Sequence, residues 1–562
     1  MRRTLLTWSA TIALAVGTVV VPTGAVHAAE SGTTHSYLVL FAERATLSEG
    51  RAAVTRAGGT VTHLNTAVGL AEVSSDNPDF LAAARSQRAV SGAARNRSVG
   101  TARPGMAPKF ADERLAGERT ATRPHSNTGP VKATPGTDAL TGYQWDMRMI
   151  NAQDDDGSPA LDERGKGVLV GIIDTGIDGT HPDIAPNFSN ALSRNFTTDM
   201  PDIDGPCEYA DCHDPANVDH DSHGTHVAGT VASPVNGIGI TGVAPEATLV
   251  NIRAGQDSGY FFLAPTVDAL TYAADAGIDV VNMSFYVDPW LYNCPDASDY
   301  VDAPAGKPTA SELAEQRAIY DAMHRALAYA HDGGVTMVAS AGNGHTDTAA
   351  PTRFDDTSPD YPGGTEYGRT VTNDCLDLPA EGPNVITVSS VGPSGIKADY
   401  SNYGNVDVAA PGGYFRDLFG TKSYRSPLNE IWAPYPEYVA RANGEVTKGG
   451  GVPSNDFVVR DCVKNSCSYY QGIQGTSMAS PHVTGVAALV IGALGGEADP
   501  DLVAQIVLQS AADHACPNPP TVDYTVVGRP ASWNATCTGT PTLNNFYGNG
   551  LVDAAAAVAL AS

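Results

Sequence analysis

The chain has little positive charge, and beyond its first residues it has no long apolar run. Its 562 residues include 34 Lys and Arg against 62 Asp and Glu, so the formal net charge is −28. Residues 138–562 carry 19 basic and 53 acidic side chains, whereas residues 1–137 carry 15 and 9. An acidic body repels nucleic acid, so no nucleic-acid partner is expected. No later run is long and apolar enough to cross a bilayer, which argues against a membrane-spanning body.

The one apolar run lies at the start of the chain and has the pattern of a signal peptide. Arg2 and Arg3 form a charged beginning, residues 5–21 are mostly apolar, and residues 26–28 or 27–29 offer a small-residue cleavage site. A membrane anchor is the alternative, but the run is barely long enough to span. We therefore expect residues 1–29 to be removed and the protein to be secreted to the extracellular space, without a membrane partner.

The sequence also lacks the paired C-x₂-C elements that are typical of zinc sites. Its cysteines number eight, and an even count in an exported chain favours disulfides over metal ligands. Other connectivities stay open on spacing alone. Pairing of sequence neighbours joins Cys207 with Cys212, Cys462 with Cys467 and Cys516 with Cys537, and leaves Cys294 and Cys375.

Residues 472–482 form a glycine-containing turn that runs straight into the helix-like apolar stretch 483–490. Gly475 allows a tight turn, and Ser477 stands where the helix would begin. A helix N-terminus offers unpartnered N–H groups and a positive field, which suits a nucleophile whose attack creates an oxyanion. A plain N-cap serine is the alternative. Residues 475–479 lack the second glycine of the G-x-S-x-G elbow, which disfavours a lipase or esterase.

Three further motifs supply the partners that a serine nucleophile needs. Residues 168–173 have a buried-strand pattern that ends in Asp174, and parallel sheets place active groups at this edge. His223 opens a His-Gly-Thr-His motif, and Asn343 follows a second buried-strand pattern at residues 335–341. Taken singly, these are a strand-end carboxylate, a histidine and an Asn-Gly turn. Their joint occurrence favours a catalytic site.

Together these motifs resemble those of the subtilisin family, the subtilases. The resemblance implies Ser477 as nucleophile, His223 as general base and Asp174 as the group that orients the base, in the chain order known for subtilisin. It also implies Asn343 as oxyanion-hole donor. The fold that it implies is α/β, with a subtilisin-like, mainly parallel sheet flanked by helices.

The same resemblance divides the chain. Residues 30–95 have the element order β-α-β-β-α-β of a small ferredoxin-like αβ domain, and they weakly resemble the inhibitory propeptides of subtilases. An independent binding module is the alternative. Residues 96–138 form an aperiodic linker that is expected to hold the processing site, and residues 139–562 form the catalytic domain. The basic leader and the acidic body favour docking of the propeptide as an inhibitor, although acidity also serves solubility.

The resemblance implies protein or peptide substrates whose main chain pairs with residues 282–284 as an added strand. Phe285 and Tyr286 stand where relatives have a small, glycine-containing turn, and their bulk is expected to narrow the pocket for the residue before the cut. The residues expected to bind substrate are Asn282, Met283, Ser284, Phe285, Tyr286 and Gly342.

Four insertions separate the family-like segments and are expected to form surface loops around the cleft. They are residues 197–221, 288–311, 345–376 and 414–466. Cys294 and Cys375 belong to two of them, close to the two walls that the resemblance implies for the pocket. We therefore expect a Cys294–Cys375 disulfide that pins both insertions near the pocket.

A calcium site is implied by segments that match the family's high-affinity site. Calcium takes 6–8 oxygen ligands, and five residues do not complete that shell. A plain glycine-containing turn is the alternative. The tentative metal ligands are the side chains of Asp183 and Asn236 and the carbonyl oxygens of Pro234, Ile238 and Ile240.

These expectations describe a secreted, monomeric serine endopeptidase that is made as a self-processing zymogen and works through an acyl-enzyme. The alternative from another class is a non-enzymatic secreted binding protein on the same scaffold. The presence of Asp174, His223, Asn343 and Ser477 argues against it.

Overall fold

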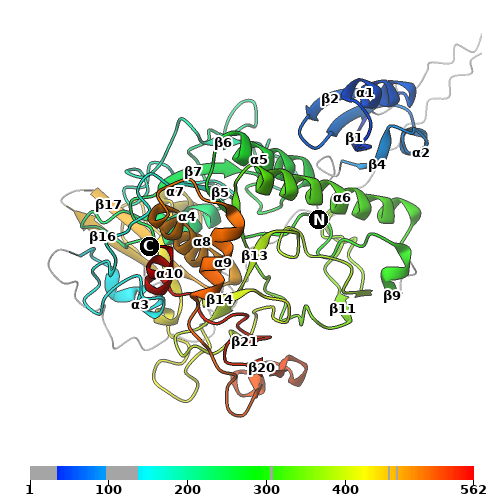
Figure 1. The fold of residues 1–562 in the computed structure, drawn as a ribbon. Helices are drawn as coiled ribbons and strands as arrows, with labels where there is room; N and C mark the ends of the chain where they lie inside the picture. Colours follow the sequence, from blue (N-terminus) through cyan, green and yellow to red (C-terminus); the bar gives the residue numbers. More distant parts are fainter. Residues whose placement is uncertain (1–33, 97–136, 304–307, 454–455, 464–465) are drawn as a thin grey trace, which may run out of the picture.

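A parallel sheet of seven strands forms the centre of the computed structural model, which describes residues 34–96, 137–303, 308–453, 456–463 and 466–562. Its order is β14-β13-β10-β8-β5-β7-β6, and the neighbouring strands run parallel (Figure 1). The predicted signal peptide and nearly all of the predicted linker lie outside the described residues. The strands are β5 (Leu169–Ile173), β6 (Arg194–Asn195), β7 (Thr248–Arg253), β8 (Val280–Met283), β10 (Thr336–Ser340), β13 (Val385–Val391) and β14 (Val408–Pro411).

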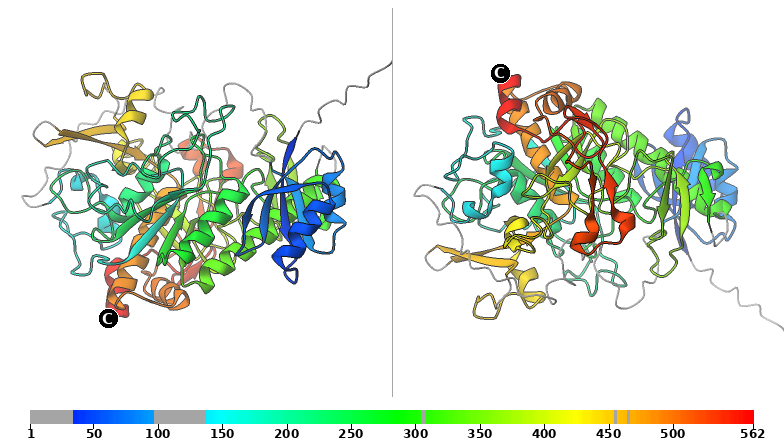
Figure 2. Two further views of the ribbon diagram at one scale, coloured as in Figure 1. Left: turned by 90° about the horizontal axis from the view of Figure 1, so that it is seen from above. Right: turned by 90° about the horizontal axis from the view of Figure 1, so that it is seen from below.

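Helices cover both faces of this sheet (Figures 1 and 2). Alternate strand residues point to opposite faces, so Val170 and Ile172 of β5 enter one core while Ile173 enters the other. Strands buried on both faces explain the nearly continuous apolar runs in the sequence. The first core packs against α4 (His223–Ala232), α8 (Thr476–Ala493), α9 (Pro500–Gln509) and α10 (Ala554–Ala561); the second packs against α5 (Leu263–Asp275) and α6 (Ala310–Asp332).

The N-terminal domain is a four-stranded antiparallel sheet with two helices. Its elements follow in the predicted order β-α-β-β-α-β, and Thr46 and Glu49 form a capping box at the start of α1. The elements are β1 (His35–Phe41), α1 (Leu47–Arg56), β2 (Thr60–Asn65), β3 (Leu70–Ser75), α2 (Phe80–Arg85) and β4 (Val90–Arg95).

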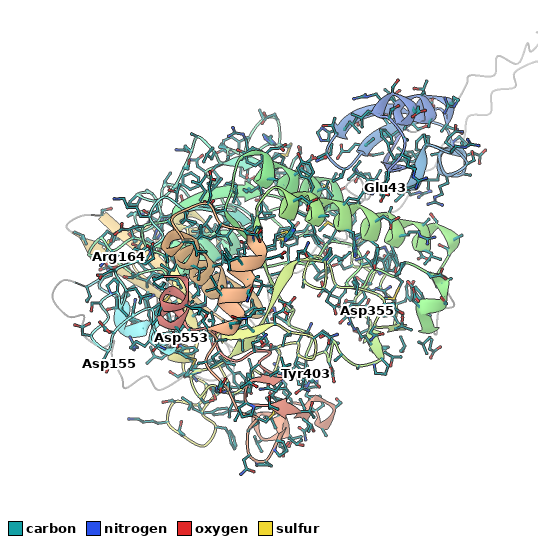
Figure 3. The ribbon with its side chains drawn as sticks, viewed as in Figure 1. Glu43, Asp155, Arg164, Asp355, Tyr403 and Asp553 are labelled. Carbon is teal, nitrogen blue, oxygen red and sulfur yellow. A yellow bond between two sulfur atoms is a disulfide. The ribbon has the colours of Figure 1, made fainter. Side chains whose placement is uncertain are left out.

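This domain lies against α5 and α6 of the large domain (Figures 1 and 2). Arg325 Nη1 donates to the carbonyl oxygen of Phe41 at 2.7 Å, and Asn65 Nδ2 donates to Asp268 Oδ1 at 2.8 Å. Glu43, labelled in Figure 3, lies on the side that faces α6, 3.9 Å from the same arginine. Leu40 joins the second core. Both apolar packing and hydrogen bonds therefore hold the two domains together.

The insertions form more regular structure than the expected loops. Two of them build a sheet of β9 (Tyr300–Asp302), β11 (Thr352–Asp355) and β12 (Arg369–Thr372). Another contains β15 (Ile431–Pro434) and β16 (Val458–Val463), which pair with β17 (Ser466–Ile473) at its end. The first of these sheets forms by pairing between segments far apart in sequence. A local sequence pattern does not predict such pairing. Among the described residues, no helix is both long and apolar enough to span a membrane.

All four predicted disulfides, including Cys294–Cys375, are present.

The remaining elements are short. The short elements are η1 (Thr141–Tyr143), α3 (Trp145–Met149), η2 (Ala297–Asp299), η3 (Pro427–Asn429), α7 (Glu437–Ala442), β18 (Thr521–Val522), η4 (Tyr524–Val527), η5 (Ala531–Trp533), β19 (Ala535–Thr536), β20 (Gly539–Thr540) and β21 (Leu543–Asn544).

Candidate active site

Ser477 is the second residue of α8, at the N-terminal end of an 18-residue helix. Its side chain is buried, at 3% exposure. Pro481 lies one turn later and has no N–H to donate to the carbonyl oxygen of Ser477. The hydroxyl of Ser284 donates to that oxygen at 3.1 Å instead. The end of β8 therefore completes the first turn of the helix that carries the serine.

Asp174 and His223 form a buried hydrogen-bonded pair. Asp174 follows β5, and its Oδ1 lies 2.8 Å from His223 Nδ1. The same oxygen accepts the Thr175 N–H at 2.7 Å. The two side chains are 0% and 1% exposed. A carboxylate at Nδ1 holds the proton there, so Nε2 of His223 is the acceptor nitrogen.

His226, one turn along α4, has a structural environment. Its Nε2 lies 3.1 Å from the carbonyl oxygens of Ile431 and Gln471. Burial, and then the neighbouring His223, lower the pKa of His226 to about 3. A neutral imidazole that ties α4 to β15 and β17 agrees with the interpretation of His223 as the reactive histidine of the motif.

Asn343 is oriented by the first residue of α8. Its Oδ1 accepts hydrogen bonds from the Thr476 backbone N–H and from Thr476 Oγ1, both at 2.9 Å. Gly342 N–H in turn donates to Thr476 Oγ1 at 3.1 Å. Because the amide oxygen faces Thr476, the amide nitrogen of Asn343 faces the other way. Gly342 has φ 94°, a conformation that favours glycine.

These groups meet because β5, β8 and β10 are adjacent in the sheet and end at the same edge. Asp174, Ser284 and Asn343 follow the carboxyl ends of the three strands, and α4 packs against α8 across them. Open α/β sheets bind ligands at this edge. Fold and site together define an α/β protein with a serine at a helix N-terminus beside an aspartate–histidine pair, an arrangement suited to acyl transfer.

The chain belongs to the subtilase family, whose match covers residues 165–550. Subtilisin DY of Bacillus licheniformis is 26% identical over 331 residues, 58% of this chain and 78% of that protein. Thermitase of Thermoactinomyces vulgaris is 26% identical over 327 residues, 58% of this chain and 89% of that protein. The protein is therefore a serine endopeptidase with a subtilisin-like fold.

Solved structures share this fold. An epidermin leader peptide processing serine protease of Staphylococcus aureus has a TM-score of 0.59 at 22% identity, over 94% of this chain and 99% of that chain. Fervidolysin of Fervidobacterium pennivorans has a TM-score of 0.52 at 22% identity, over 94% of this chain and 61% of that chain.

The structure changes one expectation about substrate pairing. Asn282 and Met283 lie inside β8, and this strand is paired with β10 on one side and β5 on the other. Their backbone therefore lies within the sheet and offers no edge for an added strand. Of the three residues predicted to pair with substrate, Ser284 alone lies beyond this ladder. Asn282 serves instead to hold Ser284, whose Oγ accepts Asn282 Nδ2 at 2.8 Å.

The bulky residues of the expected pocket wall are engaged elsewhere. Phe285 stacks on Phe261 with ring centroids 4.0 Å apart and an interplanar angle of 2°. The hydroxyl of Tyr286 donates to Asp360 Oδ2 at 2.6 Å. Both rings therefore contact neighbouring segments, and the narrowing of the pocket by Phe285 and Tyr286 stays a prediction. Neither contact is visible in the local sequence.

The predicted calcium ligands lie together but face hydrogen-bond donors. Asp183 accepts from Asn236 Nδ2 and Ile240 N–H, each at 3.0 Å, and from the Tyr470 hydroxyl at 3.2 Å. Pro234 and Ile238 belong to the same turn. In this arrangement the donor set does not fit calcium, which needs oxygen ligands. Calcium here stays a prediction, and it requires the Asn236 amide to turn; a melting temperature lowered by EDTA would support it.

An acidic cluster that the sequence analysis missed lies beside the end of β7. Arg253 is fully buried and donates to Asp214 and Asp257, each at 2.8 Å, and it lies 3.6 Å from Asp199. Burial, followed by the charges of Asp257 and Asp214, raises the pKa of Asp199 to about 7. The spacing of the three carboxylates could suit a metal, but the guanidinium already lies among them. The signal in the sequence was a lone arginine at the end of a buried strand.

Proposed function

We propose that this subtilase is secreted and cleaves peptide bonds through an acyl-enzyme formed on Ser477. The observation that carries the proposal is the buried 2.8 Å contact between Asp174 Oδ1 and His223 Nδ1 at the sheet edge where α8 begins. The signal-peptide pattern of residues 1–29 supports export.

In the proposed mechanism, His223 Nε2 accepts the hydroxyl proton of Ser477 as its Oγ attacks the scissile carbonyl carbon. Asp174 holds the imidazole in the accepting tautomer and stabilises the imidazolium. The negative charge on the former carbonyl oxygen is met by the amide nitrogen of Asn343 and the backbone N–H of Ser477. The imidazolium then protonates the leaving amine. Water, deprotonated by His223, hydrolyses the acyl-enzyme and regenerates the serine.

The N-terminal domain is proposed to be an inhibitory propeptide. Its last described residue, Asn96, lines a cavity of about 600 Å³ together with Asp199 and Gln256 of the large domain. Gly255, next to Gln256, donates its N–H to the carbonyl oxygen of Asp174 at 3.1 Å. Asn96 therefore lies on the side of the large domain that leads to the catalytic edge, which supports the proposed inhibitory role.

Two measurements test the proposal. A fluorophosphonate should label the wild-type chain and fail to label Ser477→Ala, whereas Ser510→Ala at the end of α9 should label normally. In a protease-deficient host, Ser477→Ala should accumulate as a precursor without its signal peptide. Normal processing of that variant would show that maturation does not need the enzyme's own activity, and labelling of it would contradict the assigned nucleophile.

A further inference from the structure

We propose that Asp377 makes the pocket for the residue before the cleaved bond selective for a basic side chain, lysine or arginine. This inference rests on the proposed function, because it specifies the substrate class of the same site.

The pocket is bounded by the segments that follow β8 and β10. Ser284 contacts the carbonyl oxygen of Ser477, and Gly342 contacts Thr476, so both segments touch the first turn of α8. A side chain next to a carbonyl at Ser477 must enter between them, in the crevice beyond the strand ends. Phe285 and Tyr286, which follow Ser284 on the first wall, are held by Phe261 and Asp360 through the contacts described above.

Asp377 lies beside Gly342, on the wall that follows β10. A Cβ added to Gly342 would lie 2.6 Å from Asn402 Nδ2 and 3.5 Å from Asp377 Oδ2. The segment that carries the aspartate is joined to the other wall through its backbone, because Val287 N–H donates to the carbonyl oxygen of Leu378 at 2.9 Å. The carboxylate is therefore close to the Gly342 wall, and Asp377 is only 4% exposed.

An ion pair holds the segment that carries Asp377. Arg353 pairs with Glu381 through both of its terminal nitrogens. Glu381 also accepts the Asp377 N–H at 2.9 Å, which fixes the segment.

A negative charge in a buried pocket favours a cation over an apolar side chain. An apolar group would remove water from the carboxylate without replacing its hydrogen bonds, whereas an ammonium or guanidinium would pair with it. The linker agrees with this preference, because residues 96–137 contain seven basic and three acidic side chains. A self-processing enzyme would therefore meet basic residues in its own linker.

The test compares peptide substrates that differ only in the residue before the cut: Arg, Lys, Phe or Leu. We expect wild-type kcat/KM for Arg or Lys to exceed that for Phe on the order of 100-fold. Asp377→Asn should bring this ratio close to one, and Asp377→Glu should restore part of it. Asp374→Asn, an exposed aspartate three residues earlier, is the matched control and should leave the ratio unchanged.

A second measurement needs no variant. Benzamidine, which carries an arginine-like cation, should inhibit the wild-type enzyme competitively, whereas neutral benzamide should not. Preference for Phe or Leu by the wild type, or an unchanged ratio in Asp377→Asn, would overturn the proposal. Loss of fluorophosphonate labelling in the wild type would instead overturn the proposed catalytic site.

Discussion

A single hydroxyl, that of Ser284, replaces the hydrogen bond that Pro481 cannot donate to Ser477. Ser284→Ala removes this donor from a buried carbonyl and should lower the free energy of unfolding by about 1–3 kcal/mol. Pro481→Ala restores an N–H at the same place, so Ser284→Ala should cost less in that background. Denaturant unfolding of the four chains of a double-mutant cycle measures the coupling. Equal costs in both backgrounds would show that the hydroxyl does not act through this carbonyl.

The orientation of Asn343 leads to a second prediction at one side chain. Its amide oxygen is held by Thr476, so the amide nitrogen is available to the oxyanion only while that contact exists. Asn343→Ala should lower kcat about 10²–10³-fold, the loss known for the corresponding donor in a subtilisin. KM should change little, because the oxyanion forms only after binding. A large rise in KM with unchanged kcat would assign Asn343 to substrate binding instead.

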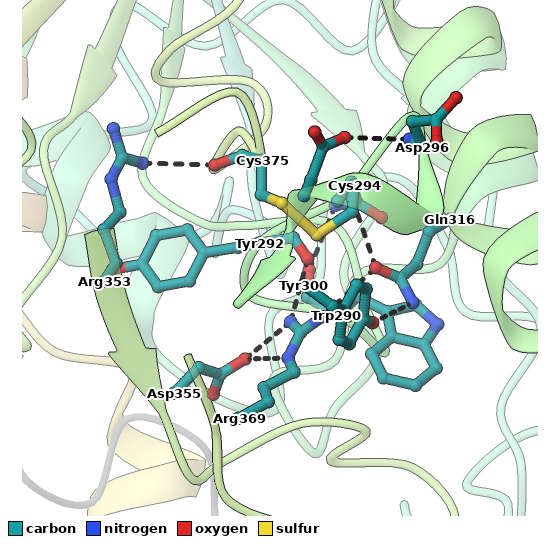
Figure 4. Close-up of a disulfide and its surroundings, with 12 residues drawn as sticks. Trp290, Tyr292, Cys294, Asp296, Tyr300, Gln316, Arg353, Asp355, Arg369 and Cys375 are labelled. Carbon is teal, nitrogen blue, oxygen red and sulfur yellow. Dashed lines mark hydrogen bonds and ion pairs between the residues drawn. A yellow bond between two sulfur atoms is a disulfide. The ribbon is translucent and has the colours of Figure 1, made fainter. Parts of the chain in front are cut away.

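Among the elements, the two insertions next to the pocket are joined by the Cys294–Cys375 disulfide, which is buried among Tyr292, Tyr300 and Val371 (Figure 4). Close to this disulfide, Arg369 forms an ion pair with Asp355. Replacing both cysteines by serine should raise KM and alter the side-chain preference before the cut, because the pocket segments become less constrained. The matched control removes Cys462–Cys467, which closes the β16–β17 hairpin, and should leave both quantities unchanged. Equal effects in the two variants would point to general destabilisation.

Helix α6 carries the docking contacts of the N-terminal domain. Arg325 donates to Phe41 and Val68 carbonyl oxygens and to Ser91 Oγ. Arg325→Ala should therefore weaken docking and shorten the lag before activity appears when the full-length precursor matures. Arg317→Ala, exposed on the same helix, is the matched control. A lag that is unchanged in Arg325→Ala would show that this helix contact does not limit release of the domain.

For the molecule as a whole, buried histidines predict acid instability. Burial lowers the pKa of His181 to about 4 and, together with His223, that of His226 to about 3. Both values lie below that of an unfolded histidine, so the unfolded chain takes up protons first as the pH falls below about 6.5. Stability should therefore decrease from pH 6.5 toward pH 4, by about 1.4 kcal/mol per pH unit for each histidine.

Denaturant unfolding of His226→Gln at several pH values tests this prediction. The stability of the variant should fall less steeply between pH 6 and 4 than that of the wild type. A slope unchanged by His226→Gln would contradict the buried neutral histidine.

His220 acts in the opposite direction. Burial lowers the pKa of His220, but Asp214 and Asp257 outweigh burial and raise it to about 10. The contribution of His220 to stability is complete below about pH 6.5 and is lost as the pH rises toward 10.

The sequence by itself determined the four catalytic candidates, the parallel sheet and the N-terminal domain's element order. Each of these depends on a short local pattern: a strand that ends in Asp174, a helix that begins beside Ser477, or the strand and helix order of residues 30–95. Apolar runs buried on both faces are typical of strands in a parallel sheet. Spacing left the cysteine connectivity open, and the structure contains the four pairs that pairing of sequence neighbours predicts.

Only the tertiary structure decided what lies between distant segments. Met283 is paired on both sides within the sheet, Phe285 stacks on Phe261, and Asp377 lies beside Gly342. The hydrogen-bond donors that Asp183 meets at Asn236 and Ile240 belong to a turn some fifty residues later in the chain. These features have one physical reason. The direction of a side chain and its hydrogen-bond partners at a sheet edge depend on how separate elements pack against one another. Residue types and their spacing along the chain do not encode that packing locally.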